Sequence, residues 1–394
     1  MKDFDRSSRR AATASSSGTS YKLPLQCSQM RGSDFRNARR RTAHGSLPTA
    51  YCLLPTAFCL LPSAVCLLLT ALCLSGFCLS ASAQTRWTRQ PSGTLAWLHA
   101  VFFIDQNRGW VVGSKGALLS TVDGGKNWQI RAKPTEDVLR DVYFSDARNG
   151  WLVCETNVYE LKTKDQPRTY LMTTNDGGTT WQRMNIREAD TDARLVRVVF
   201  SPRGRGWLFG EAGTLFTTVD EGQNWKRQQI PTRHLLLGGA LVDNDRGWLV
   251  GASATILQTS DGGDTWHAST LAEAQGVRFN AASFVDNRLG WAVGGNGKIF
   301  RTVNGGRTFQ SQASGVSADL LDVKFVNALD GWAVGADGTI VHTFDGGLHW
   351  AGESSGTSHP LERTYFTDRD HGWAVGFGGS IIAYDRGVTP KPRP

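Results

Sequence analysis

The stretch GWAVGADGTIVHTFDGGLHW, residues 331–350, is one of several near-copies of a single twenty-residue pattern. Related stretches begin at residues 109, 247 and 290, and the Gly-Trp pair that opens them occurs seven times in the chain. A fixed internal period is typical of repeat architectures, in which every copy forms one supersecondary unit. The fold can therefore be predicted from a single copy and from the number of copies.

Each copy is predicted to form four short β-strands. In residues 322–350, DVKFVN alternates polar and apolar side chains, GWAVG forms a second strand and TIVHTF a third. The segment ADG between the second and third strands predicts a tight turn with positive φ, and DGG turns the chain into a fourth strand that starts at Trp350. Four strands in about 41 residues are typical of one blade of a β-propeller.

The spacing of the Gly-Trp pairs predicts seven blades. Successive pairs lie 41 to 43 residues apart, except for one interval of 56 in the second copy. The seventh copy has no fourth strand, whereas QTRWTRQPSG at residues 84–93 resembles one. We therefore predict an all-β protein with a single seven-bladed propeller, whose ring is closed by an N-terminal strand that contains Trp87. This closure would remove two unpaired strand edges.

Residues 1–83 differ from the rest of the chain. They hold ten of the 43 Lys and Arg but only three of the 35 Asp and Glu, and residues 47–74 are four copies of one heptapeptide. An apolar run then ends at Ala81-Ser82-Ala83, a small-x-small cleavage site. We predict a basic, low-complexity leader that ends in a signal peptide cut after Ala83, and a propeller over residues 84–394. The expected location is periplasmic or extracellular; an uncleaved membrane anchor is the alternative.

Composition excludes several kinds of partner and cofactor. The net charge of +8 comes almost entirely from the leader, so we expect no nucleic-acid partner. Cys154 is the one cysteine after residue 83, which leaves neither a disulfide within the mature chain nor a cysteine-based metal site. We expect no metal and no cofactor. Membrane association is expected only through an uncleaved leader or a membrane-protein partner, and the protein is expected to be a monomer.

The repeated aspartate of the pattern T-x-D-x-G-x-x-W is a candidate acid. Six copies hold this position, with Asn304 in the fifth. An Asp in a turn usually accepts hydrogen bonds from backbone N–H groups of the same turn, and Trp is expected to pack between blades. Because a turn tolerates Asn whereas a catalytic acid does not, we interpret these residues as architectural.

The pattern T-x-D-x-G-x-x-W is the Asp-box, or bacterial neuraminidase, repeat. Together with GWxVG in seven copies, it makes residues 84–394 resemble the photosystem II stability and assembly factors of cyanobacteria and chloroplasts. The resemblance implies a non-enzymatic propeller that binds a protein. Sialidases, xyloglucanases and sortilin-type receptors also carry Asp boxes, so the box predicts the blade better than the function.

Function is expected where the copies differ. The second copy has twelve extra residues between its second and third strands, and the loops that lead into the first strands carry a cation in most blades, mixed with acids. We expect this rim to bind a partner, with Arg140, Arg197, Arg278 and Arg363 outside the blade cores; a mixed, solvated rim is the alternative. The predicted contact residues are Arg140, Arg194, Arg197, Arg233, Arg278, Arg363, Trp97, Tyr159 and Tyr170.

The sequence favours a protein-binding scaffold or assembly factor whose partner is a protein or peptide segment. No catalytic residue is predicted. The first alternative is a glycoside hydrolase, sialidase-like or another Asp-box glycosidase, which would need two carboxylates from separate loops. The second is a carbohydrate-binding propeller with exposed Trp, although thirteen of the fourteen Trp are assigned to blades.

Overall fold

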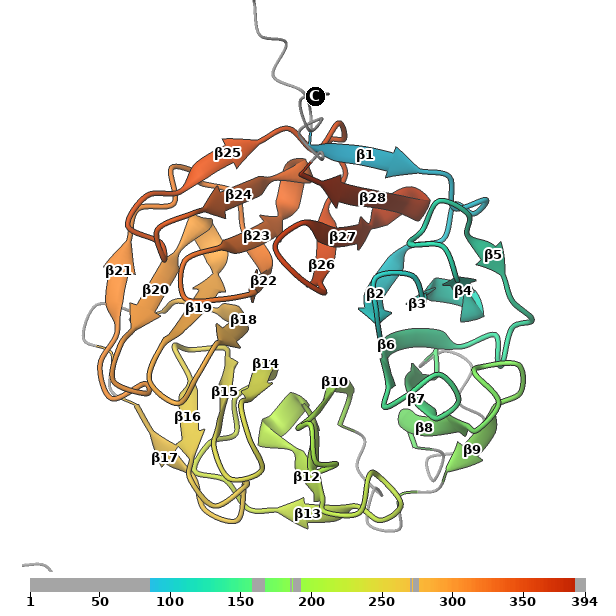
Figure 1. The fold of residues 1–394 in the computed structure, drawn as a ribbon. Helices are drawn as coiled ribbons and strands as arrows, with labels where there is room; N and C mark the ends of the chain where they lie inside the picture. Colours follow the sequence, from blue (N-terminus) through green and yellow to red (C-terminus); the bar gives the residue numbers. More distant parts are fainter. Residues whose placement is uncertain are drawn as a thin grey trace, which may run out of the picture. The chain divides into compact units, whose positions relative to one another are not determined.

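The computed structural model describes residues 86–157, 167–184, 186, 193–269, 271 and 276–386. Over these residues the chain forms seven four-stranded antiparallel sheets, arranged as blades in a ring (Figure 1). Residues of the first strands line cavities at the centre of this ring, and we call this central space the channel. The first strand of each blade lies nearest the channel and the fourth lies at the periphery (Figure 1). This confirms the seven-bladed propeller predicted from the repeat.

The blades follow one another along the chain. Blades 1 to 3 consist of β2 Leu98–Phe103, β3 Gly109–Gly113, β4 Leu118–Thr121 and β5 Gln129–Ile130; β6 Val138–Phe144, β7 Gly150–Glu155, β8 Thr169–Thr174 and β9 Gln182–Met184; and β10 Leu195–Phe200, β11 Gly206–Gly210, β12 Leu215–Thr218 and β13 Lys226–Gln228. Blades 4 and 5 consist of β14 Leu236–Leu241, β15 Gly247–Gly251, β16 Ile256–Thr259 and β17 His267–Ala268; and β18 Phe279–Phe284, β19 Gly290–Gly294, β20 Ile299–Thr302 and β21 Gln310–Gln312.

The last two blades complete the ring. Blade 6 consists of β22 Leu320–Phe325, β23 Gly331–Gly335, β24 Ile340–Thr343 and β25 Ala351–Glu353, and blade 7 of β26 Leu361–Phe366, β27 His371–Gly376, β28 Ser380–Asp385 and β1 Trp87–Gln90. Single 3-10 turns join the second and third strands of five blades: η1 Ser114–Gly116, η2 Glu211–Gly213, η3 Gly295–Gly297, η4 Ala336–Gly338 and η5 Phe377–Gly379. None of the described helices is long and apolar enough to cross a membrane.

The turn between the second and third strands has the predicted backbone conformation. In blade 6, Asp337 has a φ of 55° and Gly338 a φ of 68°. A Cβ atom on Gly338 would collide with the carbonyl oxygen of Thr357. Glycine is therefore required at this position both by the left-handed backbone and by the close approach of the next loop.

The repeated Trp and Phe residues join each blade to the next. The indole of Trp110 in blade 1 stacks on Phe144 in blade 2, with ring centroids 3.6 Å apart, and its Nε1 donates to the Gly177 carbonyl of the next Asp-box turn. Trp373 of blade 7 repeats both contacts with Phe103 and Gly124 of blade 1. Offset or stacked aromatic pairs add to the burial of apolar surface. The predicted packing of Trp between blades is confirmed.

The Asp-box carboxylates serve their own turns. Asp123 Oδ1 accepts hydrogen bonds from the Thr121 hydroxyl at 2.8 Å and from the Asn127 backbone N–H at 2.9 Å. Asn304 Oδ1 accepts the same two bonds in the fifth copy, from Thr302 and Thr308. The architectural interpretation is confirmed, because an amide oxygen replaces the carboxylate with the geometry unchanged.

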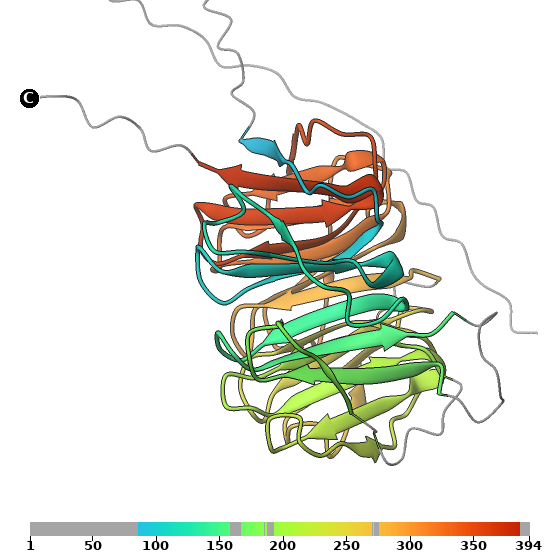
Figure 2. The same cartoon turned by 90° about the vertical axis from the view of Figure 1, so that its right-hand side faces the viewer.

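The N-terminal strand β1 is the outermost strand of blade 7. It pairs with β28 antiparallel, with Trp87 opposite Tyr384, and lies at the edge of the disc beside this last described strand (Figure 2). Trp87 is 3% exposed, and its Nε1 donates to Glu353 of blade 6 at 2.8 Å. Blade 7 thus joins both ends of the described chain in one sheet.

Candidate functional site

A cavity of about 210 Å³ opens at the end of the channel where the first strands begin. Because all seven first strands run in the same direction through the ring, the residues that start them meet around this opening, which we call the mouth. The side chains that line the mouth are His99, Arg140, Arg194, Val196, Arg197, Leu237, Arg278, Asn280, Leu321, Glu362 and Arg363. Five of the six predicted arginines therefore lie around one cavity.

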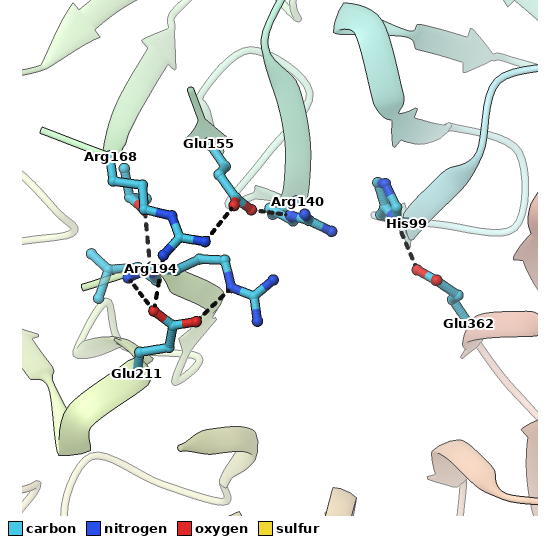
Figure 3. A network of polar contacts seen from close by, with 9 residues as sticks. His99, Arg140, Glu155, Arg168, Arg194, Glu211 and Glu362 are labelled. Carbon is cyan, nitrogen blue, oxygen red and sulfur yellow. Dashed lines mark hydrogen bonds and ion pairs between the residues drawn. The ribbon is translucent and has the colours of Figure 1, made fainter. Parts of the chain in front are cut away.

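Ion pairs hold the arginines on one side of the mouth (Figure 3). Arg168 of blade 2 lies between two acids, 3.3 Å from Glu155 and 3.3 Å from Glu211. Arg140 also pairs with Glu155, and Arg194 pairs with Glu211 at 3.2 Å. These side chains are only partly exposed, so their mutual pairing fixes the guanidinium groups in place and neutralises most of their charge.

Two arginines of the mouth lack such partners. Arg278 is exposed and Arg363 is half-buried, and neither forms an ion pair within the described part of the chain. The Nε of Arg363 is buried without a hydrogen-bond acceptor among the described residues. Across the mouth, Glu362 is occupied by His99, whose Nδ1 lies 2.7 Å from its carboxylate (Figure 3). Unsatisfied positive charge is therefore concentrated at Arg278 and Arg363.

Arg197 does not lie on the rim, as the sequence had led us to expect, but inside the channel. It is 8% exposed, and its Nη2 contacts Asp322 Oδ1 at 3.1 Å, although Arg197 belongs to blade 3 and Asp322 to blade 6. The side chain thus spans the channel below the mouth. The prediction of a rim position is wrong because an acid of the channel, Asp322, pairs with Arg197 and holds the side chain away from solvent.

The acids around Arg197 are buried and electrostatically perturbed. Burial raises the pKa of Asp141 to about 6, against the opposing effects of Arg197 and of the Val198 and Val142 N–H groups. Burial also raises the pKa of Asp322, again opposed by Arg197. Each acid accepts a backbone hydrogen bond from a neighbouring blade, Asp141 from Val198 and Asp322 from Thr364. The bridge formed by Arg197, Asp141 and Asp322 therefore links blades 2, 3, 6 and 7.

An aromatic surface borders the mouth. Trp97 is 40% exposed, and its ring lies 5.5 Å from His99 and 5.4 Å from Phe377 of the η5 turn. Phe377 is 44% exposed. Because His99 lines the cavity, Trp97 and Phe377 extend the cationic mouth with apolar area. Trp97 thus lies where the sequence placed it.

Three other predicted residues are elsewhere. Arg233 is exposed but lines a separate hollow with Pro231 and Ser253. Tyr170 is 6% exposed, and its hydroxyl donates to Asp137 at 2.6 Å while Arg183 covers its ring, so it supports blade 2 and does not face solvent. Tyr159 lies outside the described residues.

Several residues of the site were not predicted. Glu155 and Glu211 organise the ion pairs, and Phe377 extends the aromatic surface. Glu211 could have been found, because it is the one acid that directly follows a GWxxG motif. Glu155 ends the second strand of the copy that carries the insertion, and it holds the same place after its Gly-Trp pair, in GWLVCE, as Glu211 does in GWLFGE.

The chemistry offered by the mouth is recognition of anions. The guanidinium group of arginine holds several N–H donors in one fixed plane, and this geometry matches the two oxygens of a carboxylate. The described residues contain no group of three His, Cys, Asp or Glu side chains that could hold a metal ion. The glutamates of the mouth are occupied by Arg or His.

Known proteins match this chain in sequence and in fold. The Ycf48 photosystem II assembly lipoprotein of Synechococcus sp. (strain CC9902) is 27% identical over 125 residues, 31% of this chain and 34% of that protein. The chain thus matches about a third of the length of this curated relative. A solved structure described as YCF48 bound to D1 peptide has a TM-score of 0.63, 19% identity, and coverage of 77% of this chain and 96% of that one.

A glycoside hydrolase shares the fold as well. The GH74 xyloglucanase from Xanthomonas campestris has a TM-score of 0.59 and 13% identity, and the match covers 78% of this chain and 55% of that one. At this identity the likeness concerns the fold alone.

A family model described as photosynthesis system II assembly factor YCF48 matches residues 79–137, 131–233 and 223–314. These matches cover more than half of the chain and include the Asp-box turns of the first five blades. The chain therefore belongs to the photosystem II assembly factor YCF48 family.

Proposed function

We propose that this protein is a monomeric, non-enzymatic assembly or stability factor that binds an extended segment of a partner protein across the channel mouth. The observation that carries the proposal is the pair of arginines without acidic partners in the described structure, Arg278 and Arg363, in a mouth whose other charges are paired. Carboxylates of the segment would supply the missing partners, and Trp97 and Phe377 would contact its apolar side chains.

The family relationship supports a peptide as ligand. One solved relative is described as bound to a D1 peptide, and the mouth is bordered by several blades, as a segment that crosses the ring requires. A peptide that lies across the mouth would contact charges from different blades at once. Most of the binding free energy is expected from the aromatic residues, and most of the salt sensitivity from the arginines.

The arrangement of acids supports a binding role over glycoside hydrolysis. A glycosidase needs a pair of carboxylates that face the sugar, one of them protonated. Glu155 and Glu211 instead face guanidinium groups, and Glu362 faces His99. Release of reducing sugar from xyloglucan or a sialoside by the purified protein would overturn the non-enzymatic proposal.

Binding at the mouth can be tested with selected peptides. Ligands are first selected from a random-peptide phage library on the immobilised wild-type protein, and their affinities are measured by fluorescence anisotropy. We expect selected peptides to carry Asp or Glu. Arg278→Gln should lower the affinity of these peptides by up to about fivefold, because exposed charge pairs contribute about 0.2–1 kcal/mol. The affinity of the variant should also depend less steeply on salt concentration.

Arg233→Gln is the matched control, since Arg233 is also an exposed arginine but lines a different hollow. Its affinity for the same peptides should equal that of the wild type. Equal losses in the Arg233 and Arg278 variants, or a folded Arg278 variant with unchanged affinity and salt dependence, would contradict the mouth as binding site.

We also propose that the protein is exported and that its leader is cut after Ala83. The apolar run that precedes Ala81-Ser82-Ala83 supports this proposal, as does the description of one relative as a lipoprotein. Edman sequencing of the mature protein should begin at Gln84; an intact N-terminus on the cytosolic protein would contradict export.

A further inference from the structure

A second cavity, about 720 Å³ in volume, occupies the channel on the other side of Arg197 from the mouth. Its lining includes Ile104, Ser145 and Ser201, which directly follow the first strands of blades 1, 2 and 3. The cavity therefore extends toward the opposite face of the disc. We call it the chamber. A volume of about 300–1,000 Å³ is typical of sites for small molecules.

The chamber breaks the symmetry of the ring. Each blade contributes one side chain to the chamber from an equivalent position. This position lies directly before the large apolar residue that ends the first strand. In chain order these residues are Phe102, Tyr143, Val199, Ala240, Ser283, Lys324 and Tyr365. Blades 4 and 5 thus place small residues, Ala240 and Ser283, across the ring from the aromatic residues of blades 7, 1 and 2. Because Ala and Ser fill less volume than aromatic side chains, they leave room for the chamber.

The aromatic residues form one continuous wall. The ring of Phe102 lies 5.1 Å from Tyr143 on one side and 5.1 Å from Tyr365 on the other. Tyr143 also stacks on Phe200 of blade 3 at 4.4 Å. The wall is only partly buried by protein, so its rings retain apolar area for a ligand.

Cations outnumber acids in the chamber lining. The lining holds three cations, Arg197, Lys324 and Arg363, and two acids, Asp141 and Asp322, of which Asp322 pairs with Arg197. The Nζ of Lys324 has no ion pair within the described residues and lies 5.7 Å from the centre of the Tyr365 ring. Burial lowers the pKa of this ammonium group, partly opposed by Asp322. A bound anion would replace the hydration that Lys324 has lost.

We propose that the chamber binds a small aromatic carboxylate, with its ring against Phe102, Tyr143 and Tyr365 and its carboxylate at Lys324. Two features together select this class. An aromatic wall favours a planar apolar body, and an ammonium group without an ion pair in the described structure favours one negative charge. The two cavities share Arg197 and Arg363, but this site differs from the peptide site because Lys324 and the aromatic wall line the chamber and not the mouth.

The proposal can be tested with three indole probes of similar size. Indole-3-acetate carries a negative charge, indole is neutral and tryptamine is positive, and binding can be followed by saturation-transfer NMR. We expect indole-3-acetate to bind about tenfold more tightly than indole, because a hydrogen bond to a charged group contributes that much, and tryptamine to bind most weakly.

Two variants locate the site. Lys324→Met should reduce the affinity for indole-3-acetate to that of indole, and Ala240→Phe should weaken both by filling the chamber; Ser283→Leu serves the same purpose if Ala240→Phe does not fold. Arg278→Gln, at the mouth, should leave all three affinities unchanged. Equal binding of the three probes, or a folded Lys324→Met variant with wild-type preference, would overturn the proposal. The peptide affinities of the Lys324 variant should equal those of the wild type, which separates this test from that of the mouth.

Discussion

The Asp-box turns at the periphery and the channel face of the first strands differ in how similar the repeats are there. At the periphery the copies make the same contacts. The carboxylates of Asp123, Asp176 and Asp345 each accept one hydrogen bond from a Thr hydroxyl and one from a backbone N–H. On the channel face, equivalent positions hold residues as different as Phe102, Lys324 and small side chains. The periphery is therefore uniform around the ring, whereas the channel differs from blade to blade.

The two regions differ in what their side chains must do for the ring. A peripheral turn packs against the neighbouring blade, and the same kind of interface recurs between successive blades. A change in one turn therefore disturbs the packing of two blades. Channel positions contact other blades through pairs that differ from copy to copy, such as Phe102 with Tyr143 and Asp322 with Thr364, so each copy can carry a different side chain. The mouth and the chamber both lie in this variable region.

Removal of β1, the predicted closing strand, should have the largest effect, because we expect both regions to depend on an intact ring. A chain that starts at Thr94 lacks β1 and with it Trp87, which is 3% exposed. We expect a loss of at least about 3–5 kcal/mol in the free energy of unfolding, the cost of removing a buried Trp alone, together with aggregation through the exposed edge of β28. Urea unfolding followed by Trp fluorescence measures it, with the chain that starts at Gln84 as control. Equal midpoints would show that β1 is dispensable.

Removal of the channel bridge should come next. Arg197→Met leaves Asp141 and Asp322 buried without their cation, and breaking a buried pair in this way costs about 3–5 kcal/mol. Arg278→Met, at the exposed rim, should change stability by less than about 0.5 kcal/mol. Adding Asp322→Asn to Arg197→Met should recover part of the loss. Equal stability of the two single variants would mean that the bridge contributes nothing to the fold.

The smallest effect is expected at a peripheral turn. Partial burial pushes the pKa of Asp345 upward, but hydrogen bonds from His349 and Thr343 outweigh it and lower the pKa to about 2. A carboxyl whose pKa is lowered by folding stabilises the protein above its unfolded pKa, and this contribution is lost as the pH falls toward 2. Because solvent screens this 37% exposed side chain, Asp345→Asn should cost less than about 1 kcal/mol at pH 7. It should also flatten the acid limb of the melting temperature between about pH 4 and pH 2.

The fifth copy offers the reverse experiment. Asn304 already holds the turn with an amide oxygen, so Asn304→Asp should steepen the same acid limb. Melting curves from about pH 2 to pH 7 measure both variants. An unchanged acid limb in both would show that the Asp-box carboxylates do not contribute to acid unfolding.

Much of the fold could be predicted because its information is local and repeated. The strands of blade 6, the turn at Asp337 and Gly338, and the stacking role of Trp110 each follow from residue types within one copy. The site was predicted in part: the loops before the first strands do meet at the mouth, because the ring brings equivalent positions together. Arg233 and Tyr170 lie away from the mouth, since sequence position does not show which way a side chain points.

The number of blades, the strands within each and the architectural role of the Asp box follow from the sequence alone, because they depend on periodicity and on contacts between neighbouring copies. How charges and rings from distant blades combine does not. Arg197 and Asp322 are 125 residues apart in sequence yet meet across the channel, and Phe102 joins Tyr143 and Tyr365 in one wall. Such pairings depend on the closure of the ring, which places the first strands of blades 3 and 6 opposite each other, and no local pattern encodes that distance.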